Sequence, residues 1–164
     1  MVKLSPRLQK IADIVMDVMR KTGAQGVCDV GTDHAYIPIY CVAKGVAKRA
    51  VACDIADGPL ATARENVNAA HFNGYIDVRK SDGLKNVRAG EAGVTVISGV
   101  GGDTIAEILA DGKRKSEMFV LQPQTKVDKL RKQLDEMGFR ILSEHFVEEN
   151  DKEYTILVVR YCAG

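Results

Sequence analysis

Apolar residues in this chain form two kinds of run, short continuous ones and longer ones with helical spacing. The short runs are rich in β-branched residues and predict buried strands over residues 27–30, 50–53, 76–79, 94–98 and 118–121. Apolar residues three or four positions apart predict helices over residues 35–44, 57–70, 105–112 and 127–137. Strands and helices that alternate in this way indicate an α/β fold with a parallel sheet.

The two ends of the chain complete this pattern. Ser5 before Pro6 is typical of a helix start and predicts an N-terminal helix over residues 5–21, packed on the sheet with polar residues such as Arg7 facing solvent. Residues 139–147 and 153–161 predict two strands joined by the polar loop 148–152. We therefore expect a mostly parallel seven-stranded sheet with an antiparallel last strand and helices on both faces.

Length and composition indicate one ordinary globular domain over residues 1–164. The 164 residues include 23 basic and 22 acidic ones, so the net charge of +1 provides no overall field to attract a polyanion. No run is long and apolar enough to span a membrane, and no signal-peptide pattern is present, which predicts a cytoplasmic protein. The four cysteines are widely spaced and form no C-x-x-C pair, so we expect buried thiols and no metal site.

The turn after the first strand has the strongest candidate chemistry. Asp29, Gly31, Asp33 and His34 are expected at the carboxyl end of that strand, where open α/β sheets bind ligands. One glycine and two acids suit a pyrophosphate poorly and a cationic cofactor well, which favours S-adenosylmethionine. Asp54 ends the second strand, at the usual place of a ribose-binding acid. The alternative is that Asp29 or Asp33 only caps the next helix.

Further candidate ligand-binding residues follow the third and fourth predicted strands. Asp82 and Gly83 follow the third strand, where an acid can accept a hydrogen bond from the adenine amino group; the equal alternative is that Asp82 is a turn residue. Gly99, Gly101 and Gly102 follow the fourth strand and allow the backbone to approach a flat or bulky group.

The fifth strand leads into Gln122, Pro123 and Gln124, whose amides can hydrogen-bond a base edge. The helix that follows has a basic outer face. Such a face is usually solvated, and contact with nucleic acid is the alternative; its members are Lys126, Lys129, Arg131 and Lys132.

Several of these motifs resemble one family, the bacterial tRNA adenine-N1 methyltransferases that modify position 22. Residues 4–8 match its L-S-x-R-L, and residues 29–38 match D-x-G-S-D-H-A-Y-x-P with Thr32 in place of serine. Residues 57–59, 99–102 and 121–124 are similar to its E-G-P, G-M-G-G and L-Q-P-N. Val100 and Gln124 depart from the pattern in loops expected to face the substrate. The family is expected to continue into a C-terminal coiled-coil domain that helps to hold tRNA, whereas this sequence stops at Gly164. Either the sequence is truncated or the domain engages its substrate in another way, and we expect weak tRNA binding in both cases.

The resemblance implies a Rossmann-like class I methyltransferase that uses S-adenosylmethionine to methylate N1 of an adenine in tRNA. Asp33 is the expected carboxylate beside the reacting base, with His34 and Tyr36 in support. The absence of N-P-P-[YF] after the fourth strand argues against methylation of an exocyclic amine. Expected cofactor contacts are Asp29, Gly31, Asp54, Asp82, Gly83, Gly99 and Gly101, and expected substrate contacts are Gly102, Gln122, Pro123 and Gln124.

Two other functions remain open from the sequence. One is a class I methyltransferase that acts on another RNA or on a small substrate. The other is a module that binds S-adenosylmethionine or RNA without turnover. Binding of the cofactor separates all of these from a dinucleotide enzyme, and methyl transfer to tRNA separates the enzyme from the module.

Overall fold

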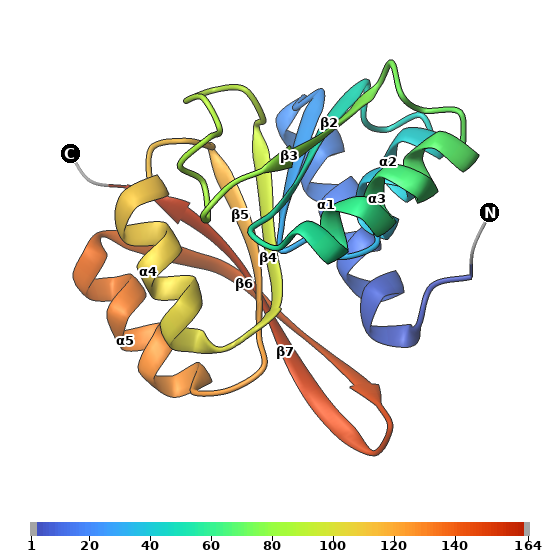
Figure 1. Cartoon of the computed structure of the whole chain (residues 1–164). Helices are drawn as coiled ribbons and strands as arrows, with labels where there is room; N and C mark the ends of the chain where they lie inside the picture. The colour runs from blue at the N-terminus through green and yellow to red at the C-terminus, as the bar shows by residue number, and fades with distance from the viewer. Residues whose placement is uncertain (1–2, 163–164) are drawn as a thin grey trace.

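A seven-stranded sheet forms the centre of the molecule, in a computed structural model that describes residues 3–162 (Figure 1). The strand order is β3-β2-β1-β4-β5-β7-β6, and β7 alone runs in the direction opposite to the other strands. The predicted sheet is therefore confirmed. The strands are β1 (Gly26–Val30), β2 (Arg49–Asp54), β3 (Ile76–Lys80), β4 (Val94–Val100), β5 (Met118–Pro123), β6 (Phe139–Glu149) and β7 (Lys152–Tyr161).

Helices cover both faces of this sheet (Figure 1). They are α1 (Pro6–Thr22), α2 (Tyr36–Ala43), α3 (Asp57–Ala69), α4 (Gly102–Gly112) and α5 (Val127–Met137). Helices α1, α2 and α3 form one core with alternate residues of the strands, while α4 and α5 form a second core with the other residues. Burial on both faces explains why the strands are continuously apolar in sequence.

The N-terminal helix begins as predicted, because the Ser5 hydroxyl accepts a hydrogen bond from the Leu8 amide at 3.3 Å. Gly23 ends it in the left-handed conformation, with φ of 75°. The expectation that Arg7 faces solvent was wrong. Its side chain is only 19% exposed and donates from Nη1 to Oε1 of Gln122 at 2.6 Å.

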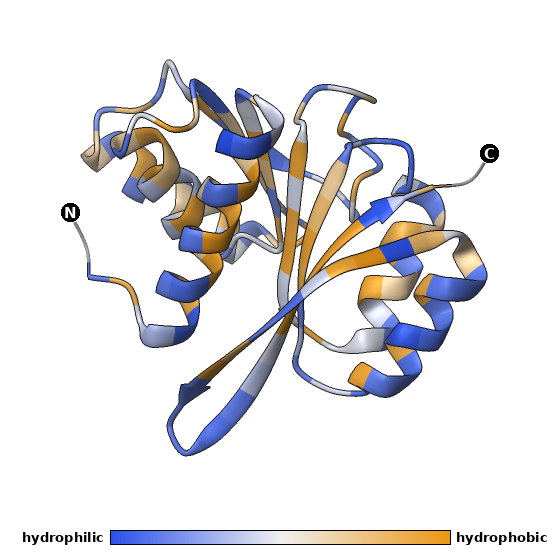
Figure 2. Cartoon of the chain, turned by 180° about the vertical axis from the view of Figure 1, so that it is seen from behind, coloured by the Kyte–Doolittle hydropathy of each residue, from blue (hydrophilic) through white to orange (hydrophobic). Residues whose placement is uncertain are grey.

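The β6–β7 hairpin has a tighter turn than the sequence predicted. Glu148 pairs with Glu153 and Glu149 with Lys152, so only Asn150 and Asp151 form the turn, both with positive φ. The expected loop over residues 148–152 was wrong because this ribbon extends into solvent, where polar residues can pair as strand residues. Figure 2 shows its hydrophilic tip projecting beyond the sheet.

Strands β4 and β5 also continue past the expected ends at residues 98 and 121. Ser98 pairs with Gln122 and Val100 with Pro123, with a register shift between these two pairs. The glycine after Ser98 thus lies in a bulge within the strand and not in a loop after it. Among residues 3–162, no helix has both the length and the hydrophobicity needed to cross a membrane.

Candidate functional site

Two pockets meet at the carboxyl edge of the parallel strands. The wide pocket, of about 530 Å³, lies between the ends of β1 to β4 and helix α4. The narrow pocket, of about 160 Å³, lies beneath the first turn of α1. Both are lined by Gly31, Asp33, Ser98 and Gly99, so the two pockets adjoin. This is the edge at which open α/β sheets bind ligands.

The turn between β1 and α2 has an unusual backbone. Gly31, Asp33 and Ala35 all have positive φ, of 71°, 57° and 60°, a conformation that costs free energy at the two residues that are not glycine. Neighbouring elements hold the turn in place. The Asp33 amide donates to Asp54 Oδ2 at 3.3 Å, and Asn66 Nδ2 donates to the His34 carbonyl at 2.9 Å. Strain maintained by surrounding contacts is typical of functional loops.

Neither acid of this turn caps the following helix. The N-cap of α2 is Ala35, and no side chain makes a capping hydrogen bond there. The capping alternative for Asp29 and Asp33 is therefore wrong, and their presence needs another explanation.

Asp29 is a buried carboxyl group in the narrow pocket, only 3% exposed. Burial raises its pKa to about 7, and the negative charge of Asp54 adds to that rise. A hydrogen bond from Thr32 Oγ1 at 2.8 Å and the positive charge of Arg7 act in the opposite direction without offsetting it. A cation placed in this pocket would stabilise the ionised form.

Asp33, His34 and Tyr36 form a more exposed group at the rim. The Asp33 side chain is 63% exposed and lies 3.4 Å from His34 Nε2. The rings of His34 and Tyr36 are stacked, with centroids 4.9 Å apart. All three residues line the narrow pocket, and Asp33 also lines the wide one. The structure thus brings the three predicted catalytic residues together.

Asp54 and Asp82 line the wide pocket together with Gly83. Asp54 accepts backbone hydrogen bonds on both oxygens, from the Ala56 and Asp33 amides, and each oxygen keeps a lone pair for a hydroxyl donor. Asp82 forms a 3.0 Å ion pair with Lys85 at the surface. Gly83 has φ of 59°, and Ile108 lies 3.2 Å from the position that a Cβ there would occupy, so a side chain would be both strained and crowded.

The glycines after β4 divide into two groups. Gly99 lines both pockets, whereas Gly101 and Gly102 line neither. A Cβ on Gly102 would lie 2.8 Å from the Thr125 carbonyl oxygen, so this glycine allows the segment between β5 and α5 to pack closely. The chain itself occupies the space expected for a ligand at this point, and the roles of Gly101 and Gly102 in binding stay predictions without a pocket contact.

Residues 122–124 are mostly buried. Gln122 is 0% exposed, Pro123 is also buried, and Gln124 is half-buried. The buried side chains can affect a substrate only through their neighbours. The sequence interpretation missed Arg7, which lines the narrow pocket and reaches Gln122. The L-S-x-R-L match was the signal that pointed to it.

The basic face of α5 is largely neutralised. Lys126 and Lys129 lie 2.7 and 3.0 Å from Asp103 oxygens, and Arg131 pairs with Asp128 and Glu144. These pairs favour a solvated face over a nucleic-acid interface at this position.

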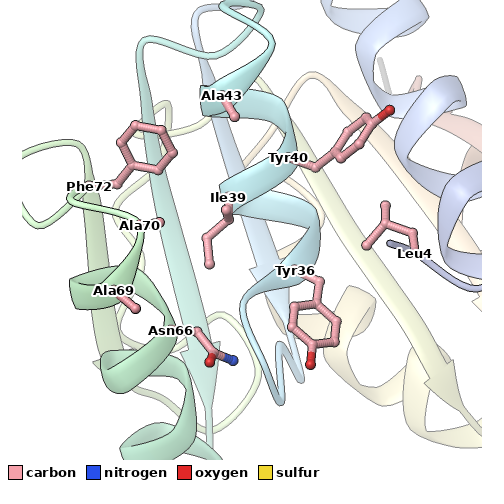
Figure 3. Close-up of a pocket in the computed structure, with 9 residues that line it drawn as sticks. All are labelled: Leu4, Tyr36, Ile39, Tyr40, Ala43, Asn66, Ala69, Ala70 and Phe72. Atoms are coloured by element: carbon pink, nitrogen blue, oxygen red, sulfur yellow. The ribbon is translucent and has the colours of Figure 1, made fainter. Parts of the chain in front are cut away.

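A third hollow, of about 480 Å³, lies over helix α2 and towards α3 (Figure 3). Its lining includes Tyr36, Ile39, Tyr40 and Phe72, and no carboxylate, histidine or cationic side chain. The carboxylates and the histidine of the predicted site therefore line the wide and narrow pockets and not this hollow.

Thiols and metal ligands do not form a site in the described part of the chain. Cys28 and Cys53 are buried with their sulfur atoms 4.0 Å apart. Contact with the Cys53 thiol, together with burial, raises the pKa of the Cys28 thiol. Within residues 3–162 there is no group of three or more histidine, cysteine or acidic side chains placed to hold a metal ion.

Comparisons with known proteins agree on one kind of relative. Residues 4–157 match a family described as "Methyltransferase domain". The tRNA (adenine(22)-N(1))-methyltransferase of Bacillus subtilis is 38% identical over 159 residues, which are 95% of this chain and 64% of that protein. A putative tRNA methyltransferase of Mycoplasma pneumoniae is 31% identical, with 93% of this chain and 70% of that protein covered. The chain thus spans less than two thirds of the Bacillus subtilis enzyme.

Solved structures show the same similarity. The Bacillus subtilis M1A22 tRNA methyltransferase TrmK superposes with a TM-score of 0.89 at 37% identity, covering 99% of this chain and 68% of that one. A putative tRNA (m1A22) methyltransferase of Streptococcus pneumoniae, in complex with S-adenosyl-L-methionine, has a TM-score of 0.87 at 38% identity. Here 97% of this chain and 73% of that chain are covered.

Proposed function

Because the chain belongs to the methyltransferase-domain family, we propose that it methylates N1 of an adenine in tRNA, using S-adenosylmethionine. Relatives named for adenine 22 indicate position 22 as the target. The observation that carries the proposal is the position of Asp33, on a strained turn where two pockets meet. We further propose that residues 1–164 form one such domain, acting in the cytoplasm where tRNA is found.

The two pockets fit this cofactor in their chemistry. Asp54 has free lone pairs for ribose hydroxyls, and Asp82 can accept from the adenine amino group. Asp29 and Gly31 in the narrow pocket suit the methionine end, because a nearby ammonium group would compensate the buried Asp29 carboxylate. When bound, S-adenosylmethionine supplies an electrophilic methyl group.

The residues at the rim then have distinct tasks. Methylation at N1 makes an adenine ring cationic and its amino group more acidic. The exposed Asp33 carboxylate can stabilise that charge and accept the proton. His34 Nε2, 3.4 Å away, can take the proton onward to solvent. Tyr36, stacked on His34, limits the movement of the imidazole.

The test is methyl transfer from S-adenosylmethionine to unmodified tRNA, with the product nucleoside mapped by mass spectrometry. We expect 1-methyladenosine at one position. Transfer to another RNA or a small molecule alone would support the broader methyltransferase alternative. Saturable cofactor binding without transfer to any RNA would support a non-catalytic module and refute the proposal.

A further inference from the structure

The buried side chain of Gln122 is fully hydrogen-bonded. Its Oε1 accepts from Arg7 Nη1 at 2.6 Å and from the Gly99 amide at 3.2 Å. Its Nε2 donates to the Pro123 carbonyl at 2.9 Å and to Gln124 Oε1 at 3.0 Å. Because a guanidinium and a backbone amide can only donate, the Gln122 amide has one permitted orientation.

This orientation determines how the neighbouring Gln124 presents its own amide. Oε1 of Gln124 must face Gln122, because turning the amide around would bring two NH₂ groups together. Among residues 3–162, Nε2 of Gln124 has no hydrogen-bond partner. The Gln124 amide N–H donates to the Val100 carbonyl at 2.7 Å, which holds Gln124 beside a residue that lines the wide pocket.

We propose that Gln124 recognises the target adenine by its N6/N7 edge, and that Gln122 and Arg7 are the positioning residues that set its amide for this task. The inference rests on the proposed function. Methylation at N1 requires the Watson–Crick edge to face the methyl donor, which leaves N6 and N7 for recognition. A glutamine amide can accept from N6–H and donate to N7 at once.

The fixed amide also explains selection against guanine. Guanine presents two acceptors, O6 and N7, on the same edge. Oε1 of Gln124 would then face O6 without a proton between them, and the bond from Gln122 prevents the amide from turning. A freely rotating glutamine would not discriminate in this way.

Arg7 connects this network to the rest of the fold. Its backbone amide donates to Glu149 Oε1 at 2.9 Å, and its guanidinium lies 5.9 Å from the centroid of the Tyr154 ring. The β6–β7 hairpin therefore holds the first turn of α1 against Gln122. An exposed arginine without these contacts would not fix the Gln122 amide.

The experiment compares tRNA with adenosine at the target position and tRNA with 7-deazaadenosine there, which keeps N1 and the amino group but lacks N7. We expect the unaltered protein to methylate the 7-deaza substrate about 5- to 150-fold more slowly, the range for loss of a specific base contact. Gln124→Ala should be slow on adenosine and bring the ratio of the two rates close to one. Gln122→Glu, which still accepts from Arg7 but cannot donate to Gln124, should also lower the ratio, with cofactor affinity by calorimetry unchanged.

Gln25→Ala is the matched control, because Gln25 is an exposed glutamine at the opposite end of β1. The ratio of the rates on the adenosine and 7-deazaadenosine substrates should be the same for this variant as for the unaltered protein. Equal rates on both substrates for the unaltered protein would overturn this inference alone. The same holds if the Gln124→Ala variant discriminates between the two substrates as strongly as the unaltered protein does. Cofactor binding without transfer to either substrate would overturn the proposed function and this inference with it. Since Gln124 is half-buried, its alanine variant tests the idea even if the buried Gln122 variant does not fold.

Discussion

Replacing Asp29 by Asn should stabilise the cofactor-free protein at alkaline pH. The pKa of this carboxyl group rises from 3.8 to about 7 on folding. The folded state therefore holds the proton more tightly than the unfolded state. The resulting stabilisation is fully present below about pH 4 and is lost as the pH rises towards 7.

The size of the effect follows from the shift. At about 1.4 kcal/mol per pKa unit, the ionised Asp29 costs the folded state up to about 4 kcal/mol above pH 7. An Asn side chain can still accept the 2.8 Å hydrogen bond from Thr32 Oγ1 and carries no charge. The melting temperature at pH 8 should rise by about 8 to 16 °C for a chain of this size.

Thermal unfolding of both proteins between pH 4 and 8 measures this difference. The stability of the Asp29→Asn variant should decline much less than that of the unaltered protein as the pH rises over this range. Its cofactor affinity should fall because the buried negative charge is absent. Asp17→Asn serves as control, since Asp17 is 58% exposed in a surface ion pair with Lys21 and should change little. Equal stability of Asp29→Asn and the unaltered protein at pH 8 would refute the reasoning.

Three further outcomes are expected. Asp33→Ala should lower the single-turnover transfer rate by about 10²- to 10⁴-fold with little change in cofactor affinity by calorimetry; equal loss of both would assign Asp33 to binding. Asp54→Ala should weaken cofactor binding by about 10-fold or more, because ribose hydroxyls and the Asp33 amide lose their acceptor, and unchanged affinity would contradict this role. Arg79 holds the pKa of Glu91 down at about 2, so this pair stabilises the fold at neutral pH and its contribution is lost as the pH falls below about 4.5. Glu91→Gln should cost about 1 to 3 kcal/mol in denaturant unfolding at pH 7 and roughly half of that at pH 3, and an equal cost at both would exclude the ion pair as the cause.

Candidate site residues differed in how well their positions followed from the sequence. Asp33, Asp54 and Asp82 each lie at the end of a strand or within three residues after it, so the shared edge of a parallel sheet was enough to predict that they come together. Gly102 lies just after β4 and Gln122 lies near the end of β5, yet Gly102 packs against the chain and Gln122 is buried. Position along a strand predicts the edge of the sheet but does not predict what already occupies the space there.

By itself, the sequence determined the order of the elements, the mostly parallel sheet and the edge at which the acids gather, because hydrophobic periodicity and strand ends are local properties. Only the tertiary structure decided the environment of each side chain. Arg7 and Gln122 are 115 residues apart, and their 2.6 Å hydrogen bond exists because the hairpin and β5 meet beneath α1. The raised pKa of Asp29 likewise depends on burial by residues distant in the chain. Desolvation and charge contacts depend on distances in space, which no local pattern contains.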